Sequence, residues 1–587
     1  MFIGKERSPR EGLSLNGIRG NRSALAVFVF SAFYFILLTI LSSIRYLDFY
    51  TLNGDLGINM QELWSNTHGY LLFETSDYKY TGAMSHLEIH SSYIALPISY
   101  LYAIIPGPMT LFIIQAAVVS LSVVALYFLA VEVTGSERVS AAISIVYGLN
   151  ASLISAVMFD FHWLSFIPLG TFLFFYLILK GRYGYSAAMI IIGSMTQEIF
   201  PFIAASILLF QFFNTREGIS LTSGWFRKNR GFAYICLGIL SVATYVILME
   251  VQVNLIPVII GNTSAIPALK GKVLHLWDLG RFPVQMSLSA AEFWFLSYLL
   301  FMFLPVFKPK HILMVAAWMY ESIAVVPFYG TLGNQYDFIT VSLMAPSAIF
   351  GLKELISRPF SGKIETRIKY MIAAAGLVII ALVADGFGIH LPDSSQIVLA
   401  VIGVILGAMA FAYVIKKSKT WSSGTRLSVS RILLILFISI ILMNVIISPL
   451  NPSNEGQSGM SGYEINYTIP PQSHYMSLIE SYVPPGSTIV TSDNLFTLIA
   501  DNVHAYSLRN IFSQPGQPPY FPYNASNLPE FLLLSSSQSM FYTPWINSSI
   551  STGIYGLVLE IKGYQYPGNI FLFRLNYTGM TEIINAG

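Results

Sequence analysis

Five ionisable side chains stand in the short connections between long apolar runs of this 587-residue chain. They are Asp55, His90, Asp160, His162 and Glu198, and the charge bias of the chain predicts that all five lie at the same, outward-facing mouth of the helix bundle. A carboxylate can act as a general base or bind a divalent cation, and an imidazole can bind the same cation or orient the carboxylate. Ionisable groups at a membrane boundary are costly to place, which makes them candidate functional groups. These residue types predict proton transfer or metal binding at a polar substrate.

Asp55 lies between two glycines, in the sequence Gly54-Asp55-Leu56-Gly57. Glycine lets the backbone turn tightly and lets a substrate approach closely. The pattern predicts a general base or a metal ligand just above the bilayer. The alternative is a turn aspartate that accepts hydrogen bonds from its own backbone.

His90 follows His86 by four residues, a spacing that puts both imidazoles on one face if the segment is helical. Two such histidines can grip a metal ion, and histidines that only form hydrogen bonds are the alternative. Glu62 lies about one turn into a short expected helix over residues 58–68, where we expect a solvated or capping side chain.

Asp160 and His162 lie in a short connection with aromatic neighbours. Residues two apart do not face each other on a regular helix, so the two side chains share a site only if the backbone is irregular. The carboxylate would then hold the imidazole. A polar turn within an aromatic belt is the alternative.

Glu198 interrupts an apolar stretch over residues 187–213 whose two flanks are basic. The stretch therefore predicts a hairpin of two short helices with Glu198 at its outer tip. Capping of the first helical turn is the other role for a glutamate at this position. Tyr336, at the start of a later span, is expected to line the same cavity.

Lys270 and Arg281 belong to a basic stretch that also holds Lys272 and His275. Such cations suit the phosphate of a lipid headgroup. An interfacial amphipathic helix with snorkelling cations is the alternative.

The composition excludes an ordinary soluble enzyme, because 54% of the residues are hydrophobic and only 11% are charged. The basic residues cluster between apolar runs and form no stripe, so no nucleic-acid partner is implied. We expect a polytopic α-helical membrane protein with about thirteen transmembrane helices and membrane lipids as partners. After a first span over residues 25–44, the later spans are placed near residues 108–132, 138–158, 163–180, 184–197, 199–214, 232–254, 290–308, 311–328, 337–352, 369–386, 396–415 and 430–449.

The charge bias of the connections predicts a multi-pass cell-membrane protein with a cytoplasmic N-terminus. Residues 1–24 form the cytoplasmic segment, and residues 25–450 form the transmembrane domain with a large first outer loop at 45–107. Residues 92–105 are treated as re-entrant or interfacial. Residues 451–587 are richer in Pro, Ser, Asn and Gly and predict an extracytoplasmic α/β domain. Within it we expect a strand at 487–491, a helix at 494–500 and a hairpin of 555–561 with 570–575.

The order of these motifs resembles the domain-of-unknown-function 2079 (DUF2079) family of predicted membrane proteins. The stretches that carry the resemblance are Gly54-Asp55-Leu56-Gly57-Ile58, His90-Ser91-Ser92, Phe159-Asp160-Phe161-His162, Gln197-Glu198, Gln335-Tyr336 and Val483-Pro484-Pro485-Gly486-Ser487. That family looks related to the GT-C glycosyltransferases, multi-span enzymes that use polyprenyl-phosphate sugars and carry an acidic residue in the first outer loop.

The resemblance implies a GT-C-like fold, a polyprenyl-phosphate-sugar donor and an envelope acceptor whose identity stays open. It implies a catalytic Asp55, and substrate-binding roles for His90, Asp160, His162, Glu198 and Tyr336. Lys270 and Arg281 would bind the donor phosphate, and a divalent cation is a possible cofactor.

Two other functions stay open from the residues. A transporter of a polar solute or a lipid-linked intermediate would use the same carboxylates as proton or cation sites. A non-catalytic envelope scaffold would only present the C-terminal domain. Ionisable groups at the mouth and the lack of a visible internal repeat favour the enzyme.

Overall fold

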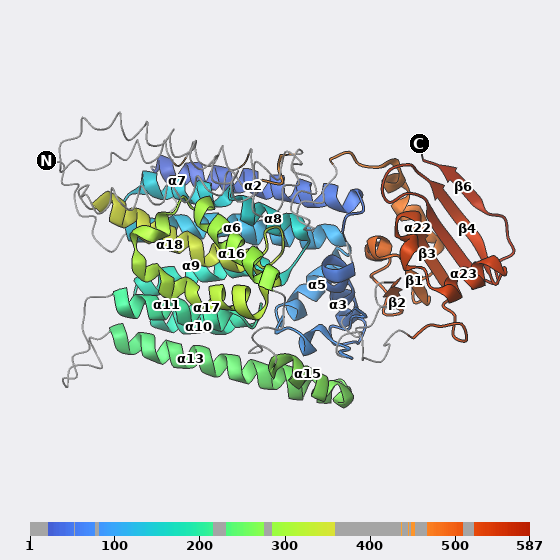
Figure 1. The fold of residues 1–587 in the computed structure, drawn as a ribbon, viewed down its shortest axis with the longest axis horizontal. Helices are drawn as coiled ribbons and strands as arrows, with labels where there is room; N and C mark the ends of the chain where they lie inside the picture. The colour runs from blue at the N-terminus through green and yellow to red at the C-terminus, as the bar shows by residue number, and fades with distance from the viewer. Residues whose placement is uncertain are drawn as a thin grey trace.

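The structure is a computed structural model that describes residues 21–51, 53–76, 82–214, 230–274, 284–357, 436, 444, 448–451, 467–508 and 522–586. The helices up to residue 357 form an elongated bundle, and strands near the C-terminus form a separate sheet at one end of it (Figure 1). Two short helices, α3 (Ile58–Thr67) and α5 (Ala95–Ile104), lie between the bundle and the sheet. They belong to residues 48–107, called here the connecting region.

The bundle is built from helices whose bounds follow the apolar runs of the sequence. They are α2 (Arg22–Leu47), α6 (Pro108–Thr134), α7 (Glu137–Gly148), α8 (Ala151–Phe159), α9 (Phe166–Leu179), α10 (Tyr183–Ser194), α11 (Phe200–Asn214), α13 (Arg230–Glu250), α14 (Ile256–Ile259), α15 (Ile266–Leu274), α16 (Val284–Leu300), α17 (Ile312–Tyr320) and α18 (Asp337–Ser357). Short 3-10 or π turns join several of them, among them η2 (His86–Glu88), η3 (Trp163–Ser165), η4 (Val251–Leu255) and η9 (Glu321–Val325).

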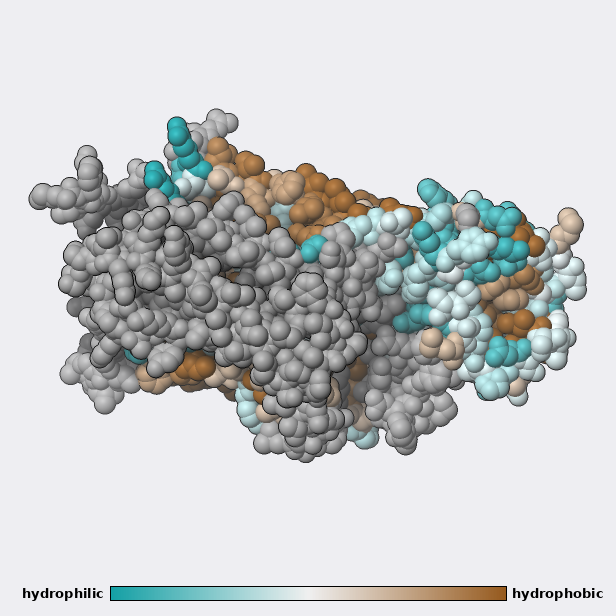
Figure 2. All heavy atoms as spheres, turned by 45° about the horizontal axis from the view of Figure 1, so that its top comes forward, coloured by the Kyte–Doolittle hydropathy of each residue, from teal (hydrophilic) through white to brown (hydrophobic). Residues whose placement is uncertain are grey.

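Helix α2 shows why the bundle suits a membrane. Its inner face buries Tyr34 and Leu38 against α6 and α7. Its other face exposes Leu25, Val29, Phe33, Ile36 and Ile40. These residues recur every three or four positions, so they form one apolar stripe. Figure 2 shows apolar atoms gathered along the bundle, whereas the sheet presents a mostly hydrophilic surface. Lipid contact explains the exposed stripe.

Among the described residues, four helices are long and apolar enough to cross a membrane, or five if the bent pair of α7 and α8 is one span. They are α2, α6, the helix over Arg230–Ile259 and α18. Shorter apolar helices stand at several other expected positions, including α9 and α11. The spans expected at 369–386 and 396–415, and most of 430–449, lie outside the described residues. The multi-helix membrane fold is therefore observed, and the count of about thirteen stays a prediction.

Helix α5 covers the segment expected to be re-entrant or interfacial. It has 10 residues. At about 1.5 Å per residue it is too short to cross a hydrocarbon core of about 30 Å. Its exposed face carries Tyr100, Leu101 and Ile104, and the opposite face packs on α3. The structure therefore contains a short helix here, and its interfacial or re-entrant position stays a prediction.

The C-terminal sheet has six strands in the order β2-β1-β3-β5-β4-β6. The strands are β1 (Ile489–Thr491), β2 (Ala505–Ser507), β3 (Phe531–Ser535), β4 (Tyr555–Lys562), β5 (Ile570–Leu575) and β6 (Glu582–Asn585). β1 runs parallel to β2 and β3, and β4 and β5 form the expected antiparallel hairpin. Helices α22 (Met476–Tyr482) and α23 (Pro544–Ser551) belong to the same unit. The expected helix at 494–500 is instead a 3-10 turn, η14 (Asp493–Leu498).

The sheet docks on the connecting region through a shared apolar core. Leu56 and Met60 of the connecting region lie in one buried cluster with Leu495 and Phe496 of η14. Burial of such apolar side chains supplies most of the stabilisation at an interface of this kind.

Polar contacts fix the position of the sheet domain on the connecting region. The Gln61 carboxamide donates to the carbonyl of Asn502 at 2.7 Å and accepts from the Thr75 amide at 2.8 Å. The Tyr102 hydroxyl donates to the Asp501 carboxylate at 2.7 Å. Because Gln61 is fully buried, its bonds are made without competing water.

Replacing Gln61 tests this docking. Gln61→Leu removes the buried carboxamide and leaves its partners short of hydrogen bonds, so we expect a loss of about 1–3 kcal/mol in the stability of the interface. Hydrogen exchange of β1 and β2 should become faster, while Ser548→Ala, at an exposed position on α23, should not change it. Unchanged exchange in Gln61→Leu would show that the apolar core alone holds the sheet.

Asp501 makes the docking depend on pH. Burial raises the pKa of Asp501 from 3.8 to about 6, although the Tyr102 hydroxyl and the nearby His68 act to lower it. The folded protein therefore binds this proton more tightly than the unfolded chain. Its stabilising contribution is complete below pH 3.8 and is lost as the pH rises through about 6.

We therefore expect the exchange protection of β2 to fall between about pH 4 and pH 6, by an amount that corresponds to about 3 kcal/mol at most. Asp501→Asn should remove this pH dependence. A variant that keeps the same pH profile as the parent protein would assign the titration to another group.

Candidate functional site

Asp55 stands in η1 (Asn53–Gly57), a π turn that leads directly into α3. The Asn59 side chain, one turn later, donates to the Asp55 carbonyl at 2.7 Å and to the Phe161 carbonyl at 3.4 Å. One buried carboxamide therefore ties the Asp55 turn to the connection that holds His162. The Asp55 side chain stays 18% exposed and can be reached from outside.

His162 lies in irregular backbone between α8 and η3. Its amide donates to the Gln115 side chain at 3.0 Å, and its Nδ1 accepts from the Leu164 amide at 3.1 Å. Because Nδ1 accepts, the proton of the neutral ring sits on Nε2. That Nε2 atom lies 3.9 Å from Asp55 Oδ1. Burial, and then the charge of His90, lowers the pKa of His162 to about 3, so the ring is neutral.

His90 and Glu198 form the next pair. His90 Nδ1 lies 2.7 Å from Glu198 Oε1, and the Ser91 amide donates to Glu198 Oε2 at 3.0 Å. Burial acts to raise the pKa of Glu198, but His90 and the Ser91 amide outweigh it and hold the pKa near 2. Glu198 is therefore a carboxylate, placed at the tip between α10 and α11 as expected.

The histidines link these pairs into one group. The rings of His90 and His162 have centroids 6.4 Å apart, and those of His86 and His90 are 5.3 Å apart. Asp55, His162, His90 and Glu198 thus follow one another across the end of the bundle that faces the sheet. Four of the five ionisable residues singled out from the sequence lie together here.

Asp160 lies beside this group but turns to a different partner. Its carboxylate is 3.5 Å from Nε of Arg45 at the end of α2, and both side chains are almost fully buried. The Gln115 side chain donates to the Asp160 carbonyl at 3.2 Å. The Arg45 pair anchors the connection that carries His162.

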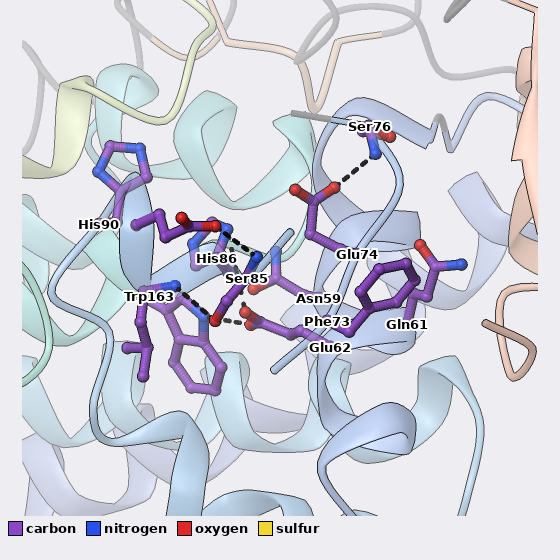
Figure 3. Close-up of polar contacts among 12 residues, drawn as sticks. Asn59, Gln61, Glu62, Phe73, Glu74, Ser76, Ser85, His86, His90 and Trp163 are labelled. Atoms are coloured by element: carbon purple, nitrogen blue, oxygen red, sulfur yellow. Dashed lines mark hydrogen bonds and ion pairs between the residues drawn. The ribbon is translucent and has the colours of Figure 1, made fainter. Parts of the chain in front are cut away.

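Glu62 differs from the expectation of a solvated or capping residue, because its side chain is fully buried. It accepts a hydrogen bond from the Trp163 indole at 2.8 Å, and its other oxygen lies 3.9 Å from His86 Nδ1. Figure 3 shows Trp163 and His86 gathered around the Glu62 carboxylate. Trp163 follows His162 in the chain, and His86 precedes His90 by four residues, so Glu62 contacts a neighbour of each candidate histidine.

The other residues predicted from the sequence, Tyr336, Lys270 and Arg281, are not part of the group formed by Asp55, His162, His90 and Glu198. Tyr336 precedes α18, with its ring centroid 4.0 Å from that of Tyr329. Burial, and then the charges of Tyr329 and Asp55, raises the pKa of Tyr336 well above its usual range, so its hydroxyl keeps its proton. Lys270 is exposed on α15. Arg281 lies outside the described residues.

A divalent cation was left open by the sequence. Within the described part of the chain, no three His, Cys, Asp or Glu side chains lie close enough together to hold a metal ion.

Sequence reasoning missed the supporting side chains Arg45, Asn59, Gln61 and Gln115. Each is a polar residue in or beside a helix that the structure buries to 2% exposure or less. The one sequence feature that could have indicated buried polar side chains is the close spacing of Asn59, Gln61 and Glu62 within one short helix. This spacing does not distinguish a buried helix from an exposed one, because the sequence does not show that the sheet domain covers α3.

A comparison with protein families agrees with a membrane chain. A family model described as "Predicted membrane protein (DUF2079)" matches residues 45–401. No curated protein matches the chain. Among solved structures, the crystal structure of ArnT from Cupriavidus metallidurans in the apo state aligns with 92% of this chain and 98% of its own, at 10% identity and a TM-score of 0.43.

Replacing Glu62 tests the hydrogen bond that its carboxylate accepts from the Trp163 indole. Glu62→Leu leaves the buried Trp163 indole without its acceptor, so the free energy of unfolding should fall by about 1–3 kcal/mol. Glu62→Gln keeps an oxygen for that bond and should cost less. Thermal unfolding of both variants in lipid nanodiscs measures the difference, and equal losses would contradict the role given to the indole bond.

Proposed function

The chain belongs to the DUF2079 family of predicted membrane proteins, and on this premise we propose that it is a membrane glycosyltransferase of GT-C type. It takes a sugar from a polyprenyl-phosphate donor at the outer face of the membrane and transfers it to an envelope acceptor. The observation that carries the proposal is the partly exposed Asp55 carboxylate that faces the Nε2–H of a neutral His162 at 3.9 Å.

Asp55 is the general base. An acceptor hydroxyl placed between solvent and the carboxylate gives its proton to Asp55, while its oxygen attacks the anomeric carbon of the donor sugar. The bond from that carbon to the phosphate oxygen breaks, and the polyprenyl phosphate leaves with the electron pair. Attack from the side opposite the phosphate inverts the anomeric centre. The phosphate is a good leaving group, so positioning supplies much of the rate.

His162 orients this base. The Leu164 amide donates to Nδ1, so the ring proton sits on Nε2, the atom that lies 3.9 Å from Asp55 Oδ1. The separation of 3.9 Å exceeds a hydrogen bond, and such catalytic contacts often tighten only when substrate is bound. Because the ring is neutral, it orients Asp55 without protonating it.

His90 and Glu198 bind substrate hydroxyls in this proposal, since both keep more than a fifth of their side-chain surface exposed. Tyr336 can donate to the same substrate from the side of α18. Asp160 acts through Arg45, which holds the His162 connection.

The membrane sidedness follows the charge bias of the sequence. We place the connecting region and the C-terminal sheet outside the cell membrane and the N-terminus in the cytoplasm. The exposed Lys270, together with Arg281, is proposed to meet the donor phosphate. A transporter that uses the same carboxylates is the competing function, and it predicts solute movement without a sugar-transfer product.

The central variant is Asp55→Asn, which keeps the shape of the side chain and removes the base. Transfer from radiolabelled polyprenyl-phosphate sugars by purified protein in lipid should fall by about 10²- to 10⁴-fold. Glu530→Gln, at the surface of the sheet domain, is the matched control and should transfer normally.

Wild-type transfer by Asp55→Asn would contradict the assignment of the base. Flux of a polar solute into proteoliposomes, with no transfer product from any donor, would favour the transporter.

A further inference from the structure

The order of the strands gives the C-terminal sheet a place where a ligand is expected. β1 lies between β2 and β3 and is parallel to both. From the carboxyl end of β1 the chain continues to β2, which lies on one side of β1 in the sheet. From the carboxyl end of β3 the chain continues to β4, which lies on the opposite side. The connections that leave these two neighbouring strands therefore run in opposite directions. Open α/β sheets bind ligands in the crevice at such a switch point.

Polar side chains occupy the carboxyl ends of these two strands. The Ser535 amide at the end of β3 donates to the Ser492 hydroxyl after β1 at 2.9 Å. The Asn494 amide, further along, donates to the Gln538 side chain at 3.4 Å. Gln538 is half-buried, and its neighbour Ser536 is exposed, so the group reaches the surface of the domain.

The carboxamide of Asn494 is the unusual member of this group. The residue is 1% exposed, and neither its side-chain nitrogen nor its oxygen has a hydrogen-bond partner among the described residues. Buried polar groups in native proteins are nearly always paired, so an exception calls for a ligand or an ordered water. A carboxamide offers donors and an acceptor together, as sugar hydroxyl groups require.

The same segment also touches the Asp55 turn. Asn494 lies at the start of η14, and η14 contacts η1. Leu495 and Phe496, which follow Asn494, share a buried apolar cluster with Leu56, which follows Asp55. The unpartnered carboxamide is therefore carried by the element of the sheet domain that packs on the candidate base.

We propose that Asn494 and Gln538 bind a neutral, hydroxyl-bearing carbohydrate at the switch point of β1 and β3. The inference rests on the glycosyltransferase function and deepens it, because it gives the sheet domain a part in substrate recognition. The carbohydrate is either the sugar of the lipid donor or a sugar unit of the acceptor. Both present the same hydroxyl chemistry to the two carboxamides.

Binding is measured first, without turnover. Methyl hexosides and methyl pentosides are titrated by saturation-transfer NMR into full-length protein that carries Asp55→Asn. Adding Asn494→Leu, which removes the donors and the acceptor, should weaken binding of the preferred glycoside at least about tenfold. Gln538→Leu should do the same with less disturbance of the core, because Gln538 is half-buried. Asn547→Leu, at an exposed position on α23, is the matched control and should bind normally.

Transfer kinetics then identify the source of the sugar. In protein with Asp55 intact, Asn494→Leu should raise the KM for one substrate and change kcat little. A higher KM for the lipid donor assigns the site to the donor sugar, and a higher KM for the acceptor assigns it to the acceptor.

Two outcomes separate this inference from the function on which it rests. Normal glycoside binding by folded Asn494→Leu and Gln538→Leu proteins, with transfer intact, would overturn the carbohydrate site and leave the transferase standing. Glycoside binding that depends on Asn494, with no transfer by the parent protein, would support the site and overturn the transferase.

Discussion

The burial of three polar side chains on helix α3 is the constraint on which the site depends. Asn59, Gln61 and Glu62 are each 2% exposed or less. A buried polar group without a partner is costly, so each must find one. Asn59 bonds to the Asp55 turn and to Phe161, Gln61 to the sheet domain, and Glu62 to Trp163. One helix of 10 residues therefore fixes the relative positions of the candidate base, the histidines and the sheet.

The same arrangement gives each buried or half-buried carboxylate of the site a different partner. The Asp160 carboxylate is neutralised by Arg45 inside the protein, and the Glu198 carboxylate is held by His90. Asp55 faces a histidine whose neutral state follows from its burial. The Arg45 pair therefore occupies the Asp160 carboxylate, whereas the Asp55 side chain stays partly exposed.

The sequence predicted the membrane helices and the grouping of ionisable residues because both rest on strong local signals. Apolar length marks α2, α6 and α18, and the C-terminal hairpin follows from alternating strands. The charge bias placed Asp55, His90, His162 and Glu198 at one end of the bundle, and their separations agree.

Long-range partners were beyond the reach of the sequence. Glu62 was expected to be solvated, yet the connection that carries Trp163 covers it, and the two residues are 101 positions apart. Asp160 meets Arg45 across 115 positions, and Gln61 meets Asn502 across 441. No periodicity or spacing encodes such contacts, because they depend on how separate elements pack.

The most direct test of the central claim is an electron cryo-microscopy structure of the protein in lipid with a bound polyprenyl-phosphate sugar. The account predicts that the anomeric carbon lies at the end of the bundle beside Asp55, with His162 Nε2 now within hydrogen-bond distance of the carboxylate. It also predicts that α3 keeps its contacts to the sheet. A donor bound elsewhere in the bundle, with Asp55 still 3.9 Å from His162 and far from the sugar, would contradict it.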